Sequence, residues 1–175
     1  INFNLHNNFW HNQLKFILKN KKSYGEKSLV NNQSINIEFV SANPTGPLHV
    51  GHVRGAVLGD SLANILSKVG YRVIREYYVN DAGNQVEILA HSVFLRYKEI
   101  LTSKKIQIPE GYYPGEYLIP LAQNIVDKFQ DKLLNQELEK SIKIIKEISI
   151  DWNLNNIKGD LKKINILMDV YTSEK

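Results

Sequence analysis

One continuous segment of this chain is far more specific than the rest: Ser41-Ala42-Asn43-Pro44-Thr45-Gly46-Pro47-Leu48-His49-Val50-Gly51-His52. Residues 35–40, directly before it, alternate apolar and polar side chains, which predicts a strand. Pro44 and Pro47 prevent a helix across the loop, and an apolar stripe of helical period begins at His52. A strand, a turn and a His-x-Gly-His step onto a helix favour nucleotide binding, because two imidazoles and the free N–H groups of a helix end can face the same phosphates.

The residues that follow predict a βαβ unit. The helix that starts at His52 is expected to close at Gly70, and residues 71–79 read as a second strand. Residues 80–83 form a turn that can cap the next helix. Strand, helix, strand and helix at this spacing favour a parallel pair of strands. Ligands of such sheets bind beyond the carboxyl ends of the strands, which places the loops 41–52 and 80–85 at the site.

The two flanks of this unit are predicted to be helical. Residues 1–22 carry apolar side chains at helical spacing, and residues 20–33 are polar and read as a linker. A loop is expected over about 101–115, because Pro109, Gly111 and Pro114 interrupt the pattern. The periodicity then predicts three more helices, over residues 117–133, 136–148 and 157–166.

The segment 41–52 resembles the signature of class I aminoacyl-tRNA synthetases, in the form that the arginyl enzymes carry. Four further stretches resemble arginyl-tRNA synthetase segments in the same order: residues 59–64 (GDSLAN), 75–85 (REYYVNDAGNQ), 113–117 (YPGEY) and 168–174 (MDVYTSE). The resemblance implies an α/β fold with a Rossmann-like parallel sheet, of which this chain holds the first half of the catalytic domain. It also implies that residues 1–33 are the tail of an N-terminal domain plus a linker. Residues 34–175 would then be the N-terminal half of the nucleotide-binding catalytic domain, with a helical insertion over about 106–150.

The function that this resemblance implies is arginine–tRNA ligase. The carboxylate of arginine attacks the α-phosphate of ATP, pyrophosphate leaves, and the arginyl group moves to the 3′ end of tRNA(Arg). The implied catalytic residues are His49 and His52, and the implied ATP-binding residues are Pro47, His49, Gly51 and His52. The residues implied for arginine binding are Glu38, Ser41, Asn43 and His49. Mg²⁺ would arrive with ATP, held by its phosphates, and no metal site of the protein's own is expected.

Each of these residues also has a purely structural interpretation. The two histidines can cap a helix with packed imidazoles, and Asn43 can form an Asx turn ahead of Pro44. Glu38 can be an outward-facing strand carboxylate. Asp81, Gly83 and Gln85 can bind a ligand directly, or Asn80 or Asp81 can simply cap the following helix.

Composition sets weaker limits on function. The 175 residues carry a net charge of +4, which favours acidic partners such as tRNA but also follows from a lysine-rich codon bias. The absence of cysteine excludes disulfides and thiolate zinc sites. No apolar run approaches a membrane span and no signal-peptide layout opens the chain, so we expect a cytoplasmic protein without a membrane partner.

The sequence also lacks the second signature of the family, a Lys-Met-Ser-Lys-Ser type of loop. We therefore expect these residues alone not to charge tRNA, and we expect the full-length enzyme to be a monomer. Two alternatives stay open at this point. One is a non-catalytic remnant of such an enzyme, and the other is a different nucleotidyl transferase that uses a His-x-Gly-His turn.

Overall fold

The computed structural model describes residues 1–26 and 33–175. Helix α1 (Asn7–Asn20) and the 3-10 helix η1 (Lys21–Ser23) confirm the predicted N-terminal helix. The Nδ1 atom of His6 caps α1 by accepting the N–H of Asn8 at 3.3 Å. Residues 27–32 of the predicted linker, including the Asn31-Asn32 turn, lie outside the described residues.

The sheet has three strands, β1 (Ser34–Glu38), β2 (Arg72–Val79) and β3 (Val170–Ser173), in that order. Both pairings are parallel, with Ile35 opposite Val73 and Glu76 opposite Val170. The predicted parallel pair β1–β2 is thus confirmed. The third strand was not predicted from the sequence.

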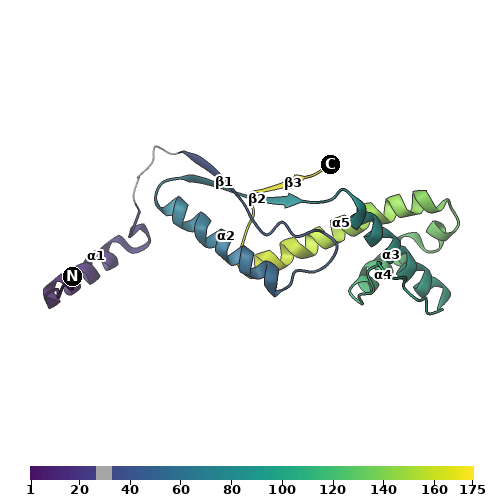
Figure 1. Ribbon diagram of the computed structural model, residues 1–175, viewed down its shortest axis with the longest axis horizontal. Coiled ribbons are helices and arrows are strands. Elements are labelled where there is room, and N and C mark those ends of the chain that lie inside the picture. The colour runs from purple at the N-terminus through teal and green to yellow at the C-terminus, as the bar shows by residue number, and fades with distance from the viewer. Residues whose placement is uncertain (27–32) are drawn as a thin grey trace.

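Helix α2 (Val50–Lys68) connects β1 to β2, and Gly70 follows its last turn with φ +104°. Figure 1 shows α2 and the long helix α5 (Leu138–Lys163) on the same side of the sheet. Their shared core with the sheet consists of Phe39, Ala56, Tyr77, Val79, Ile157, Leu161 and Ile166. Gly59 allows α2 to approach, because a Cβ there would lie 2.3 Å from the ring of Phe39.

The remaining helices form a separate packed group, which we call the helical unit. It contains α3 (Asn84–Thr102), α4 (Leu118–Phe129), the 3-10 helix η2 (Lys132–Leu134) and the first half of α5. Its core consists of Leu89, Ala90, Val93, Tyr97, Leu118, Leu121, Ala122, Ile125, Leu133, Ile142 and Ile145. The predicted loop after α3 is confirmed.

The prediction of two separate helices over residues 136–148 and 157–166 is wrong. Both belong to the single 26-residue helix α5, which ends at Lys163. The apolar stripe looked interrupted because its inward positions between the two predicted helices include Ser149 and Asn153, both buried. Serine and asparagine at core positions hide the helical period from a sequence reading.

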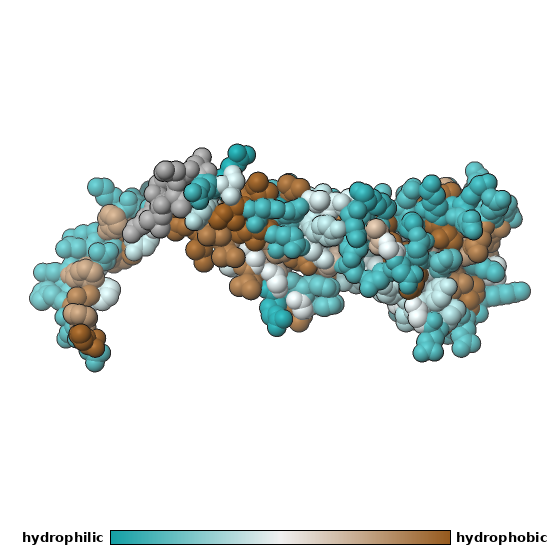
Figure 2. Space-filling view, turned by 45° about the horizontal axis from the view of Figure 1, so that its top comes forward, coloured by the Kyte–Doolittle hydropathy of each residue, from teal (hydrophilic) through white to brown (hydrophobic). Residues whose placement is uncertain are grey.

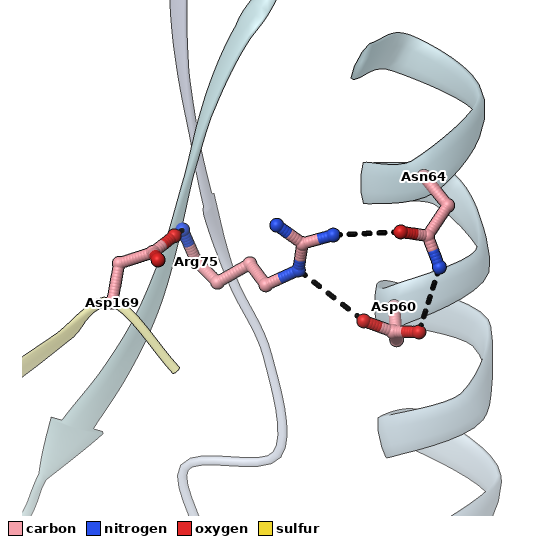
Figure 3. A network of polar contacts seen from close by, with 4 residues as sticks. All are labelled: Asp60, Asn64, Arg75 and Asp169. Atoms are coloured by element: carbon pink, nitrogen blue, oxygen red, sulfur yellow. Dashed lines mark hydrogen bonds and ion pairs between the residues drawn. The ribbon is translucent and has the colours of Figure 1, made fainter. Parts of the chain in front are cut away.

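A polar network joins α2, β2 and the segment before β3 (Figure 3). The guanidinium of Arg75 donates to Asp60 at 3.2 Å and to Asn64 at 2.8 Å, while Asn64 also donates to Asp60. On the other side, the backbone N–H of Arg75 donates to the carboxylate of Asp169. Side chains at residues 60, 64 and 169 therefore fix the central strand on both sides.

Within residues 1–26 and 33–175, none of the helices has the length and apolar character that crossing a membrane would require.

Candidate functional site

Two loops meet beyond the carboxyl ends of β1 and β2, as the parallel sheet predicts. The first leaves β1 through a sharp turn, in which Val40 and Ser41 have positive φ values of +70° and +39°. A β-branched residue such as Val40 rarely adopts this conformation, and such strain gathers at functional sites. The turn directs the chain into residues 42–49 and then into α2.

His49 and His52 lie together at the start of α2. The Nδ1 atom of His49 accepts the N–H of Gly51 at 3.1 Å, and the Nδ1 atom of His52 accepts the N–H of His49 at 3.2 Å. The two rings stack, with their centroids 3.7 Å apart and their planes 24° apart. The helix-capping interpretation of the pair is therefore confirmed as geometry, and both rings also line a pocket.

The capping bonds determine which ring nitrogen carries the hydrogen. Because both Nδ1 atoms accept a backbone N–H, each neutral ring carries its hydrogen on Nε2. Partial burial, and next the proximity of His49, lower the pKa of His52 below its usual value. At neutral pH His52 is thus a neutral hydrogen-bond donor, and the helix N-terminus beside it adds a partial positive charge.

Gly51 has a structural role besides the one expected from the sequence. A Cβ at this position would lie 3.0 Å from the imidazole of His49. A side chain there would press on the ring that caps the helix. Pro47 lies on the wall of the same pocket and is exposed.

Ser41 and Glu38 contact each other at the end of β1. The hydroxyl of Ser41 donates to the carboxylate of Glu38 and accepts the N–H of Tyr78 at 3.0 Å. Glu38 is exposed, as the interpretation of an outward-facing strand carboxylate predicts. The same position leaves its carboxylate open to a cationic partner.

Asn43 joins the two loops. Its side-chain amide donates to the side-chain oxygen Oε1 of Gln85, in the first turn of α3, at 2.6 Å. The Asx-turn interpretation is wrong, since the N–H of Thr45 donates to the backbone carbonyl of Asn43 instead. The side-chain oxygen of Asn43 can still serve as an acceptor for a ligand.

The second loop does not cap α3 as the structural interpretation expected. Gly83 occupies the N-cap position, and no side chain caps that helix. Asp81 is buried and instead accepts hydrogen bonds from the hydroxyl of Ser173, at 2.8 Å, and from the N–H of Glu174, at 3.1 Å. Asp81 therefore fixes the end of β3 beside the loop.

A cavity of about 460 Å³ lies against the signature segment. Its lining comprises Asn43, Thr45, Gly46, Pro47, Leu48, His49, His52, Tyr113 and Tyr117. The two tyrosines belong to the stretch before α4 and were not predicted as site residues, although a Tyr-x-Gly-x-Tyr stretch in a loop is a visible signal. A cavity of about 710 Å³ beside α3 and α5 contains none of the signature residues, so the smaller cavity is the candidate site.

Three side chains from distant parts of the chain hold the carbonyl groups of the loop. The hydroxyl of Tyr77 donates to Ala42 at 2.7 Å, and the side-chain amide of Asn153 donates to Pro44 at 2.9 Å. The hydroxyl of Tyr117 donates to Thr45 at 3.0 Å. Burial, and next the neighbouring Tyr113, raise the pKa of Tyr117, so this phenol keeps its hydrogen at neutral pH.

The comparisons with known proteins agree with this arrangement. The profile of the family "tRNA synthetases class I (R), catalytic domain" matches residues 13–170, and the chain belongs to this family. The different nucleotidyl transferase that stood as an alternative is thereby set aside.

Among its relatives are the arginine–tRNA ligases of Bartonella bacilliformis and Rickettsia bellii. They are 53% and 51% identical over all 175 residues. The chain spans 30% of the length of each. A crystal structure of a Campylobacter jejuni protein assigned to the arginyl-tRNA synthetases superposes with a TM-score of 0.84 at 38% identity, covering 97% of this chain and 37% of that one. The first half of a class I catalytic fold, expected from the sequence, is confirmed.

Proposed function

We propose that this chain supplies the part of an arginine–tRNA ligase that binds the ATP phosphates and the amino-acid end of arginine. The observation that carries the proposal is the pair of stacked imidazoles at the start of α2. Both residues line the 460 Å³ cavity, and the caps at their Nδ1 atoms leave the Nε2–H as the donor of each neutral ring. Donors fixed in advance at a phosphate are what transfer of an adenylyl group needs, because charge stabilisation and positioning provide most of the catalysis.

In this proposal the carboxylate of arginine attacks the α-phosphorus of ATP, and pyrophosphate leaves. His49 and His52 donate to the phosphate oxygens, while Pro47 and Gly51 line the approach of the nucleoside. Asn43, Ser41 and His49 hold the amino-acid end, and Glu38 offers a carboxylate to the guanidinium. Mg²⁺ enters with ATP on its phosphates, and the arginyl group passes to tRNA(Arg).

The division of the chain into residues 1–33 and 34–175, with a helical insertion over about 106–150, is part of the same proposal. So are a cytoplasmic location and a monomeric full-length enzyme.

A chimaeric enzyme tests the function. Residues 1–175 replace the matching 30% of the Bartonella bacilliformis ligase, and arginylation of tRNA is measured with the purified protein. We expect the chimaera to be active and His49→Ala to lower kcat by about 100-fold or more, the usual effect of removing a donor to developing negative charge. His52→Ala should act in the same direction.

The matched control is His6→Ala, which removes a histidine cap of the same kind at α1, away from the cavity. Its rate should equal that of the unchanged chimaera. Equal rates for His49→Ala and His6→Ala would mean that His49 and His52 only cap the helix. The assignment of these histidines as donors to the ATP phosphates would then be wrong. An inactive chimaera would favour a non-catalytic remnant, and residues 1–175 alone should show no arginylation.

A further inference from the structure

Residues 42–45 of the signature loop are held mainly by side chains of α3, of α5 and of the stretch before α4. Of the four side chains that anchor residues 42–45, three belong to these elements: Gln85 in α3, Tyr117 before α4 and Asn153 in α5. They stand 42, 72 and 109 residues away from their partners in the sequence. Among the described residues, Tyr77 is the one side chain of the sheet that anchors residues 42–45, while Ser41, just before them, is held by Glu38 and by the N–H of Tyr78.

Asn153 is the anchor whose presence is hardest to explain by stability. It is buried, at 5% exposure, in the interior of α5, where asparagine has a poor helix propensity. Its amide donates to the carbonyl of Pro44, and Pro44 is itself fully buried. An apolar residue of similar size would suit the helix and its core better, but it would leave that carbonyl without a donor.

Tyr117 is built into its place just as specifically. Gly115 makes room for it, since a Cβ there would lie 2.2 Å from the tyrosine ring, and a Cβ added at Gly46 would lie 3.4 Å from the same ring. The stretch that carries Tyr117 is tied to α3. The N–H of Tyr113 donates to Ser92 at 2.9 Å, and Arg96 donates to the carbonyl of Pro114 at 2.7 Å. The segment that carries Tyr117 is thus held against α3, and this fixes the position of the hydroxyl that donates to Thr45.

We propose that Asn153 and Tyr117 are positioning residues for the reaction. They fix the carbonyls of Pro44 and Thr45, and through that loop they set where His49 and His52 stand. The inference rests on the proposed function, because the histidines have a reaction to serve only if that function is correct. It assigns a catalytic purpose to α5 and to the stretch before α4, which contribute no catalytic side chain of their own among the described residues.

Two substitutions that keep the packing test the inference in the chimaeric enzyme. Asn153→Leu replaces the amide with an apolar group of similar size and higher helix propensity. Tyr117→Phe keeps the ring and removes the hydroxyl. We expect each to lower kcat for arginylation by roughly tenfold or more, while KM for ATP changes less than about threefold. The reason is that a misplaced hydrogen-bond donor stabilises the transition state less well, whereas it affects substrate binding less.

The matched control is Tyr97→Phe. The hydroxyl of Tyr97 also donates to a backbone carbonyl, that of Gln130, but it lies in the core of the helical unit away from the loop. It should lower the melting temperature without lowering kcat. If Asn153→Leu and Tyr117→Phe lower the melting temperature and leave kcat unchanged, the two residues are only structural and the inference is wrong.

Amide hydrogen exchange on the 175-residue chain separates this inference from the function on which it rests. Asn153→Leu should speed exchange at the N–H groups of Ser41, Thr45 and His52 by about tenfold or more, and Tyr97→Phe should leave them unchanged. An inactive chimaera with faster loop exchange would defeat the proposed function but keep the anchoring of the loop. Unchanged exchange of these N–H groups in Asn153→Leu would show that Asn153 does not anchor the loop, whether or not the chimaera is active.

Discussion

The helical unit and the sheet with α2 differ in how fully they bury their apolar side chains. The core of the helical unit is enclosed on several sides, with Leu121 and Ile145 almost completely buried. On α2, by contrast, Val57, Leu58, Leu62 and Ile65 are between 46% and 71% exposed. Figure 2 shows the same contrast, with apolar side chains gathered over the part of the body near β1 and α2 and a mostly polar surface at the helical end. The helical unit is therefore a closed core, whereas the outer face of α2 leaves apolar side chains open to solvent.

The largest expected effect comes from breaking the closed core. Ile145→Ala should lower the free energy of unfolding by about 2–5 kcal/mol, since it removes buried methyl groups and leaves a cavity. The matched change on the open side is Leu58→Ala, at a position 71% exposed, which should cost less than about 0.5 kcal/mol. Urea unfolding of the chain measures both.

Equal losses for the two variants would contradict the comparison. They would mean that the outer face of α2 is covered in solution, which a repeat of the unfolding at several protein concentrations would reveal as self-association.

A second prediction sharpens the comparison within α2 itself. Gly59→Ala should destabilise the fold by about 1–3 kcal/mol, because the added methyl group meets the ring of Phe39 on the packed side of the helix. Gly55 lies one turn earlier, and nothing stands within 4 Å of a Cβ added there. Gly55→Ala should therefore stabilise the protein by about 0.5–1 kcal/mol through helix propensity. Thermal unfolding checks both, and a loss at both positions would show that α2 is packed all round.

The sequence predicts the parts of this molecule whose pattern is local. The alternation in residues 35–40 and the stripe after His52 were sufficient for β1, α2 and the parallel pair with β2. Strand β3 was missed because it has only four residues and exists through its pairing with β2. Helix α5 was split because buried polar residues replaced apolar ones in its middle.

The candidate site follows the same rule. His49, His52 and Asn43 are recognisable from spacing within one segment, as are the two loops that follow parallel strands. Asn153 and Tyr117 act on backbone carbonyls 109 and 72 residues away, and no local pattern contains such a contact. The stacking of the two imidazoles and the tautomer that their caps require also depend on the folded helix start.

The smallest expected effect concerns the dependence of stability on pH. The start of α2 and the helical unit should lose stability in two different pH ranges. The pKa of His52, at the start of α2, is lowered by its partial burial and then by His49. The unfolded chain therefore binds a proton at this residue near pH 6.5, and the folded chain binds it only at a lower pH. The contribution of His52 to the free energy of unfolding is fully present above pH 6.5. It is lost as the pH falls toward the pKa that His52 has in the folded state. In the helical unit the pKa of Glu99 is lowered by its bond to Arg96 and then by the N–H of Ile106, so its contribution is lost only below about pH 4.5.

Urea unfolding between pH 4 and pH 8 can distinguish these ranges. His52→Gln should flatten the pH dependence of the unfolding free energy just below pH 6.5 and leave the acidic range unchanged. Glu99→Gln should flatten the pH dependence in the acidic range, below about pH 4.5, and leave the slope just below pH 6.5 unchanged, because the substitution removes the carboxylate that titrates in the acidic range. If His52→Gln kept the slope below pH 6.5, the neutral imidazole would not be what the folded state prefers. A protonated ring carries a hydrogen on Nδ1 as well, so it could not accept the N–H of His49, and the helix cap that this hydrogen bond forms would fail.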